Sequence, residues 1–389
     1  MVFSNKSLKF TIAILIACLP LFGFANNPQD STQTHLKTPH VTSEANHAAI
    51  NESAHEGHGE PLTLGQKIDA YKAHHLLDAH HFTFFSDEKT GQHFGFPLPV
   101  ILWDNGLQFF SSSKFDHGHA VAESNGNYYT LGHDEKIYKT DAAGTLTGDE
   151  HHPTNIKPID FSITKNVLTM LVVALIMFLI FSGLAKSFSK NGGISAGFGR
   201  IFEPLVLYIR DEIAIPNIGE KHYKKYMSYL LTIFFFVWFL NIFGLTPLGI
   251  NVTGNIAITA GLAIITAIIT NFTANKNYWN HIFWMPGVPV LMKIVLAPIE
   301  LLGVIIKPFS LMIRLYANIV AGHIVMMSLI ALIFIFGSLL GGVLSFLLSF
   351  AISMIEILVA LLQAYIFTML SALYFGAAVE EHHHEEAHH

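Results

Sequence analysis

The sequence contains few cysteines and few charged residues for its length. Only one of its 389 residues is cysteine, Cys18, and only 13% are charged. A single cysteine excludes a disulfide framework and a cysteine-ligated zinc site. The net charge of −6 is unevenly spread and forms no basic surface. Nucleic acid is therefore not an expected partner.

Apolar residues are what the sequence has in excess. They make up 51% of the chain and give it a mean hydropathy of +0.45. This composition is too apolar for a soluble protein of this length and is typical of a polytopic membrane protein. We expect an all-α membrane fold over most of the chain.

The chain begins with the pattern of an export signal. Lys6 and Lys9 precede an apolar run over residues 10–22, which Gly23-Phe24-Ala25 follows. This order predicts a signal peptide over residues 1–25 that is removed after Ala25. Residues 15–18 also resemble a bacterial lipobox, in which case Cys18 would be lipidated. The start of the mature chain is expected outside the cell.

Residues 26–160 form a separate region before the membrane part. Residues 26–61 are polar and histidine-rich, which predicts a flexible arm. From Phe82 onward, short apolar runs alternate with turn signals such as Asn105-Gly106 and Asn125-Gly126, which predicts hairpins in a small β-rich domain. Most of the 23 histidines lie in this region. Without cysteines or zinc-type spacing we interpret them as surface residues, so we expect no metal site and no cofactor.

Residues 161–379 make up the predicted membrane domain. Five of its stretches are long enough to span a bilayer: 163–185, 229–248, 256–272, 299–336 and 339–375. The last two exceed the roughly 20 residues that a span needs, so we expect them to tilt strongly. Residues 202–219 mix apolar and charged residues, which predicts a helix lying at the membrane interface.

Loop charge predicts the orientation. Lysine and arginine gather in residues 186–228, and Lys276 and Lys293 follow the third span, whereas the loops after the second and fourth spans have none. The positive-inside rule places the basic loops in the cytoplasm, the N-terminal domain outside and the C-terminus inside. Residues 380–389 are then a cytoplasmic tail rich in His and Glu, and the predicted location is a bacterial inner membrane.

The fourth span carries charge where charge is costly. Glu300, Lys307 and Arg314 recur every seven residues and lie within about 40° of one another on a helix. Ser310 and Asn318 lie one turn to either side of Arg314. An arginine at the bilayer centre costs at least about 2.5–3.5 kcal/mol, which indicates a function. The alternative is a structural Arg–Glu pair that joins two helices.

Two further features complete this pattern. His323 lies about 180° around the helix from Arg314, although we expect Pro308 to end or kink the helix near its start. On the fifth span Ser349, Glu356 and Gln363 share a face, and Glu356 is expected to meet His323. The pair would exchange protons, or it is a buried pair that only ties two helices together.

Four stretches resemble subunit a of F-type ATP synthases, the membrane stator that brings ions to the rotor. They are KPFSLMIRLYANIVAGH from Lys307, IEILVALLQAYIF from Ile355, FFFVWFLNIFGLTPLG from Phe234 and NVTGNIAIT from Asn251. The resemblance extends over about residues 162–379. Acidic residues that some relatives carry near the end of the second span are absent here, and Gly244 and Gly249 lie there instead, so the place where the outer access path begins is left open.

This resemblance implies the roles of individual residues. Arg314 matches the family's essential arginine, and Asn318, Glu300, Asn241, Glu356 and Gln363 match polar family positions. His323 and Glu356 exchange the residue types of many bacterial relatives. We expect Gln363 to hold the Arg314 side chain by a hydrogen bond.

The implied function is the translocation of ions, with protons expected first and sodium left open, through two offset half-channels. The implied partners are a ring of c subunits, b-type peripheral stalk subunits, the rest of the complex and the lipid bilayer. This chain itself would carry no ATP chemistry and would need no cofactor.

Two other classes of function remain as alternatives. A secondary transporter or metal-ion transporter would also place charge inside the membrane, but the sequence shows no internal repeat. A purely structural membrane anchor leaves Arg314 and Glu356 without a purpose.

Overall fold

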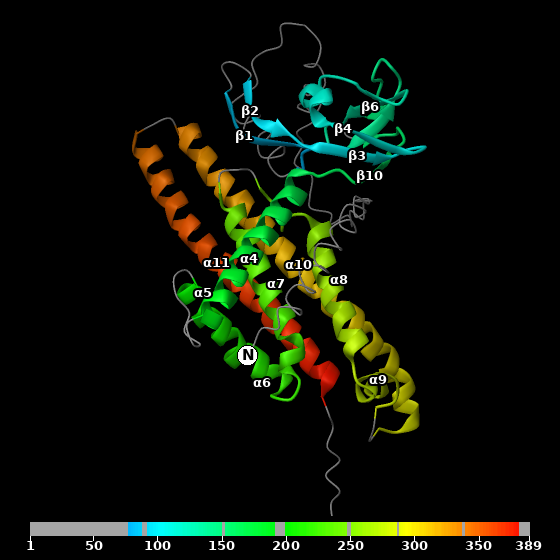
Figure 1. The fold of residues 1–389 in the computed structure, drawn as a ribbon, viewed down its shortest axis with the longest axis vertical. Helices are drawn as coiled ribbons and strands as arrows, with labels where there is room; N and C mark the ends of the chain where they lie inside the picture. Colours follow the sequence, from blue (N-terminus) through cyan, green and yellow to red (C-terminus); the bar gives the residue numbers. More distant parts are fainter. Residues whose placement is uncertain are drawn as a thin grey trace, which may run out of the picture.

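The fold is known from a computed structural model that describes residues 77–87, 92–149, 152–190, 199–246, 250–285, 288–336 and 339–380. The predicted signal peptide, the arm over residues 26–61, Cys18 and the tail after Glu380 lie outside these residues. The described chain forms a β-rich domain at one end of a group of long helices (Figure 1).

The β-rich domain is built from short antiparallel strands. Its elements are β1 (His81–Asp87), β2 (Gln92–Pro97), β3 (Pro99–Trp103), β4 (Leu107–Ser111), the 3-10 helix η1 (Ser112–Gly118), β5 (Ala122–Ser124), β6 (Asn127–Leu131), β7 (Ile137–Thr140), β8 (Gly148–Asp149), β9 (His152–Pro153) and β10 (Ile159–Asp160). They pair as β1-β2, β10-β3-β4, β5-β6-β7 and β8-β9.

Both predicted hairpin turns are confirmed. Asn105 (φ 51°) and Gly106 (φ 130°) join β3 to β4, and Asn125 (φ 49°) and Gly126 (φ 77°) join β5 to β6. The two-residue turn between β5 and β6 requires positive φ at both residues, and Asn-Gly meets this requirement with the least strain. The connection between β3 and β4 has three residues, 104–106, and its last two have positive φ.

The core of this domain follows from the alternation along its strands. Val100, Leu102 and Phe110 point inward and are buried, while their neighbours along β3 and β4 are more exposed. The Phe110 ring stacks on Tyr129 of β6 with the ring centroids 6.1 Å apart. A small core therefore joins the two three-stranded sheets.

Polar contacts connect the domain to the first long helix. The His80 imidazole pairs with the Asp160 carboxylate at 2.9 Å. Asp78 accepts a hydrogen bond of 2.9 Å from the Thr164 hydroxyl and one of 3.1 Å from the backbone amide of Asn166. Burial by itself lowers the pKa of His80. The hydrogen bond and negative charge of Asp160 outweigh this effect and raise the pKa above its ordinary value, which favours the ion pair.

The rest of the described chain is helical. The helices are α4 (Lys165–Lys190), α5 (Gly199–Tyr208), the π-helix η2 (Ile209–Ala214), α6 (Ile215–Ile218), α7 (Tyr223–Gly244), α8 (Ile256–Thr273), α9 (Lys276–Phe283), α10 (Val290–Phe336) and α11 (Leu339–Val379). Within the described residues, α4, α7, α8 and α11 are long and apolar enough to cross a membrane. This establishes a mostly helical fold consistent with a polytopic membrane protein.

All five predicted spans fall on helices, and of these helices α10, which carries the fourth, is not among the four named above, so the number of spans stays a prediction. Two details differ from the prediction. The second predicted span reaches residue 248, but α7 begins at Tyr223 and ends at Gly244. Of the two outcomes predicted for Pro308, an end of the helix is wrong, because α10 runs through Pro298 and Pro308 over 47 residues, whereas a kink stays a prediction. Proline removes only one backbone hydrogen bond, and membrane helices tolerate this loss where neighbouring groups satisfy the freed carbonyl.

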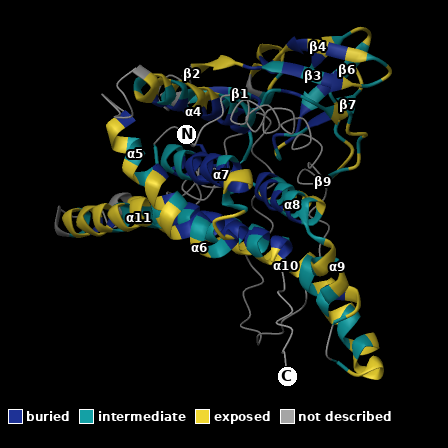
Figure 2. Ribbon diagram, turned by 60° about the horizontal axis from the view of Figure 1, so that its bottom comes forward, coloured by how far each residue is buried: buried dark blue, intermediate teal, exposed yellow. Residues whose placement is uncertain are grey.

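Helix α7 lies at the centre of the helical part, where it appears largely buried (Figure 2). Aromatic rings fill the space around it: Tyr226 stacks on Phe375 of α11 at 4.5 Å, and Phe235 meets Phe181 of α4 edge-on at 4.9 Å between centroids. Close packing of this kind makes α7 the rigid support for α10 and α11.

The predicted interfacial helix is present as the continuous run α5–η2–α6. Ile209 and Ile213 are fully buried, and η2 packs on α7 while α6 packs on α11. Gly376 of α11 allows this contact, because a Cβ atom there would collide with the backbone of Asn217. The helix is confirmed, and its position at a membrane surface stays a prediction.

Candidate functional site

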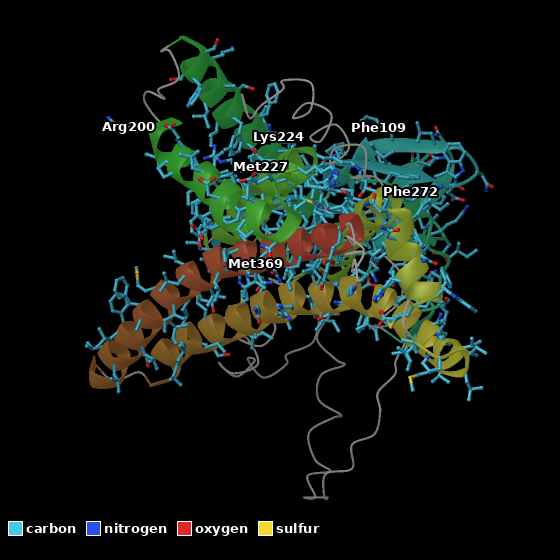
Figure 3. All side chains as sticks on the ribbon, turned by 90° about the horizontal axis from the view of Figure 1, so that it is seen from below. Phe109, Arg200, Lys224, Met227, Phe272 and Met369 are labelled. Atoms are coloured by element: carbon cyan, nitrogen blue, oxygen red, sulfur yellow. The ribbon has the colours of Figure 1, made fainter. Side chains whose placement is uncertain are left out.

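The polar residues of α10 form a column on an exposed side of the helix. Arg314, Ser310 and Asn318 are exposed, and they are spaced four residues apart. Leu311, Leu315 and Ile319, each one residue further on, are buried against the other helices. Figure 3 shows α10 running beside α11, the helix that carries Met369. The column therefore faces out of the chain rather than into its core.

The structure corrects the expected partner of Gln363. Gln363 is 2% exposed, and its Oε1 atom accepts a hydrogen bond of 2.7 Å from the Asn318 amide. Among the described residues Arg314 makes no hydrogen bond, with Gln363 or with any other group. Asn318 lies one helical turn beyond Arg314, and its side chain contacts α11. The Arg314 side chain lies on the exposed side of α10.

Glu300 and Lys307 share the helix of Arg314 but not its surroundings. Both are half-buried and line a cavity of about 210 Å³ between α9, α10 and the end of α11. The Lys307 ammonium lies 5.9 Å from the centre of the Tyr374 ring of α11. The predicted series of charged residues on α10 therefore begins at this cavity, with Glu300 and Lys307, and ends at the exposed Arg314.

His323 follows Gly322 on α10, and Glu356 of α11 packs against that glycine. His323 is 6% exposed, and a Cβ atom on Gly244 of α7 would lie 3.4 Å from its Nε2 atom. The Glu356 carboxylate occupies the space that a side chain at position 322 would need. The structure therefore places the Glu356 carboxylate against α10 at Gly322, while the His323 ring lies beside Gly244 of α7. No hydrogen bond or ion pair joins the two within the described chain, so their acting as a pair stays a prediction.

Asn241 connects three segments near this pair. It is 3% exposed, its amide donates to the Ala360 carbonyl of α11 at 3.4 Å, and its Oδ1 atom accepts from the Thr253 hydroxyl at 2.9 Å. Thr253 belongs to the turn between α7 and α8. Asn241 thus holds that turn against α11.

The sequence interpretation missed four residues around the site. They are Asn251, Thr253, Tyr278 and Tyr374. The Asn251 Oδ1 and Ser349 Oγ atoms are buried without a hydrogen-bond partner in the described part of the chain. Asn251 and Thr253 could have been found, because they are polar residues between two apolar stretches, in the turn between α7 and α8. No sequence signal indicated Tyr278 or Tyr374.

Fold and site together define a class of protein. A permanent cation exposed on a long apolar helix, with a buried imidazole further along that helix and a carboxylate on the next, is the arrangement of an ion-translocating membrane subunit. Residues 167–376 match the family model described as ATP synthase A chain, which is more than half of the chain. The chain belongs to the ATP synthase subunit a family.

Individual relatives agree with the family model. ATP synthase subunit a of Chloroherpeton thalassium is 42% identical over 237 residues, which cover 59% of this chain and 70% of the relative. ATP synthase subunit a 2 of Prosthecochloris aestuarii is 37% identical over 308 residues, covering 75% of this chain and 94% of the relative. Residues 71–161 match a second model, described as a domain of unknown function (DUF8433), which includes the β-rich domain.

Proposed function

We propose that this chain carries protons across the membrane in the F0 sector of ATP synthase and couples their flow to rotation and ATP synthesis. The observation that carries this proposal is Arg314, an exposed arginine on a helix within the matched region. The transporter alternative has no comparable support.

The exposed polar column is our proposed contact with a ring of c subunits. A membrane carboxylate on the ring that comes within about 4 Å of Arg314 is stabilised in its ionised form by about 4 kcal/mol at an effective dielectric constant of 20. It then releases its proton. Moving on into lipid requires that the carboxylate be neutralised again, because an unpaired charge there is costly.

We assign the outer half-channel to the region of His323 and Glu356. Asn241 and Thr253 hold the adjacent turn, and the partnerless oxygens of Asn251 and Ser349 would bind water along the path. Gly244 lies beside the His323 imidazole, at a place where some relatives carry an acidic residue. We propose that His323 supplies the polar group there instead.

We assign the inner half-channel to the cavity beside Glu300 and Lys307. Its lining includes Tyr278, His281 and Glu380, and it is large enough for several waters. Arg314 lies between the two regions along α10. Its guanidinium carries a permanent positive charge, so it blocks a direct proton leak without itself relaying protons.

The partners are tested by co-purification. We expect an affinity-tagged form of this chain, extracted in mild detergent, to bring with it a stable ring of small hairpin subunits and the b-type stalk subunits. Mass spectrometry of the intact complex measures this. Recovery of the chain alone or as a homo-oligomer, from membranes that synthesise ATP, would contradict the proposal.

The orientation is tested by labelling single cysteines. We propose an exported domain over residues 26–160, five spans in a bacterial inner membrane and a cytoplasmic tail over residues 380–389. In spheroplasts, Ala142→Cys in the β-rich domain should react with an impermeant thiol reagent, and Lys224→Cys should react only after lysis. Both positions are exposed on the chain, so they form a matched pair. Labelling of Lys224→Cys before lysis would reverse the orientation.

A further inference from the structure

The short helix α9 is fixed between the ends of the two longest helices. The backbone amide of Asn275 donates to the Ala378 carbonyl at 2.8 Å, and its side-chain amide donates to the Val379 carbonyl at 2.9 Å. These bonds satisfy carbonyls that the end of α11 leaves unpaired. Helix α9 also packs on α10, at the end of the molecule away from the β-rich domain (Figure 1). Its side chains therefore have defined positions at the base of the proposed inner half-channel.

Two cavities meet at α9. The larger, of about 210 Å³, is the one beside Glu300, His281 and Glu380. The smaller, of about 20 Å³, lies between α8, α10 and α11 and reaches further along α10, to Leu311, so we call it the deeper cavity. Its polar lining is Thr266, Thr270, Asn271, Tyr278, Lys307 and Tyr374. The deeper cavity holds about one water molecule. Tyr278, Val304 and Lys307 line both cavities, so they form the boundary between them.

Tyr278 is the one of these three that α9 contributes. Its side chain is half-buried, whereas Lys276, Asn277 and Asn280 of the same short helix are exposed. Burial first, and then the negative charge of Glu300, raises the pKa of its hydroxyl, so the group stays protonated and uncharged. An uncharged ring with a hydroxyl at its tip narrows a water path without placing a fixed charge in it.

We propose that Tyr278 is the constriction of the inner half-channel, where its ring separates the water-filled outer cavity from the deeper one that leads along Lys307 and Tyr374 toward Arg314. This rests on the proposed function of the cavity. Tyr278 is a positioning residue: it limits how water and hydrated ions reach the deeper cavity. The ring carries this role, so phenylalanine should replace it and alanine should not.

The test measures access to the deeper cavity. Thr270→Cys places a thiol in the lining of that cavity, and inverted vesicles expose the cytoplasmic side to silver ions, a small thiol-reactive probe. We expect Thr270→Cys to react slowly in the otherwise unchanged complex, equally slowly with Tyr278→Phe, and several-fold faster with Tyr278→Ala. Asn277→Cys, in the outer cavity, should react rapidly in all three backgrounds.

Matched controls separate the constriction from general loosening of α9. Trp279→Ala removes the ring that stacks on Phe283 at 6.2 Å and does not line either cavity, so it should leave the Thr270→Cys rate unchanged. Tyr278→Val provides a second small side chain if the alanine variant fails to assemble. Subunit stoichiometry checks assembly in every background.

The outcomes are distinguishable. Equal Thr270→Cys rates with tyrosine and alanine at position 278 would overturn the constriction, whether both are fast or both slow, and would leave the outer cavity as proposed. An acceleration by Trp279→Ala equal to that of Tyr278→Ala would also overturn it. An unreactive Asn277→Cys would instead contradict the proposed inner half-channel itself.

Discussion

Arg314→Ala should assemble into a complete complex that cannot couple proton flow to ATP synthesis. The structure supports normal assembly, because Arg314 is exposed and makes no hydrogen bond within the described residues. Losing a stabilisation of about 4 kcal/mol changes the ionisation equilibrium of a ring carboxylate about a thousandfold. ATP synthesis should fall to background, and passive proton flux should rise because no charge separates the two half-channels.

Arg314→Lys distinguishes the proposed gate from a structural ion pair. A structural role would tolerate lysine, whereas we expect lysine to fail. An ammonium in low dielectric loses its proton more readily than a guanidinium and offers no bidentate geometry to a carboxylate. ATP synthesis and passive flux in reconstituted vesicles measure both variants.

The control for both variants is Arg200→Ala, an exposed arginine at the start of α5 that lies outside the proposed site. It should retain coupling. Full coupling in a correctly assembled Arg314→Ala complex would refute the mechanism.

The second large effect concerns His323 and Glu356. His323→Ala or Glu356→Ala should reduce ATP-driven proton pumping severely, because each removes one protonatable group from the proposed outer half-channel. The double exchange, His323→Glu with Glu356→His, should pump better than either half of the exchange alone. One imidazole and one carboxylate remain at positions 323 and 356, whereas each half-exchange leaves two groups of the same kind.

Pumping is measured in inverted vesicles at matched complex content. Ser353→Ala is a suitable control on α11, because its hydroxyl contacts the Ser349 carbonyl of its own helix and the Met326 sulfur of α10, and neither member of the proposed pair. A double exchange no better than its halves would show that the two residues do not act together.

Sequence and structure agree best where the determining interactions are local. The two Asn-Gly hairpins follow from the backbone preferences of two residues each, and they are found as predicted. The long helices follow from apolar stretches, since a backbone in lipid must satisfy its own hydrogen bonds. The ends of helices follow less directly from the sequence, as the end of α7 and the continuation of α10 through Pro308 show. Contacts with neighbouring segments outweigh the local backbone preference at these positions.

The sequence by itself determined the family and the residues that carry charge in the membrane part, because an arginine in an apolar helix is conspicuous in any conformation. Tertiary structure alone decided what those residues contact. Gln363 bonds to Asn318 and not to Arg314. His323 lies beside Gly244, and Glu356 lies beside Gly322. Tyr278 lines a cavity together with Glu300 and Glu380. These contacts join residues far apart in the chain, and they depend on how the helices pack, which the pattern along any one helix does not specify.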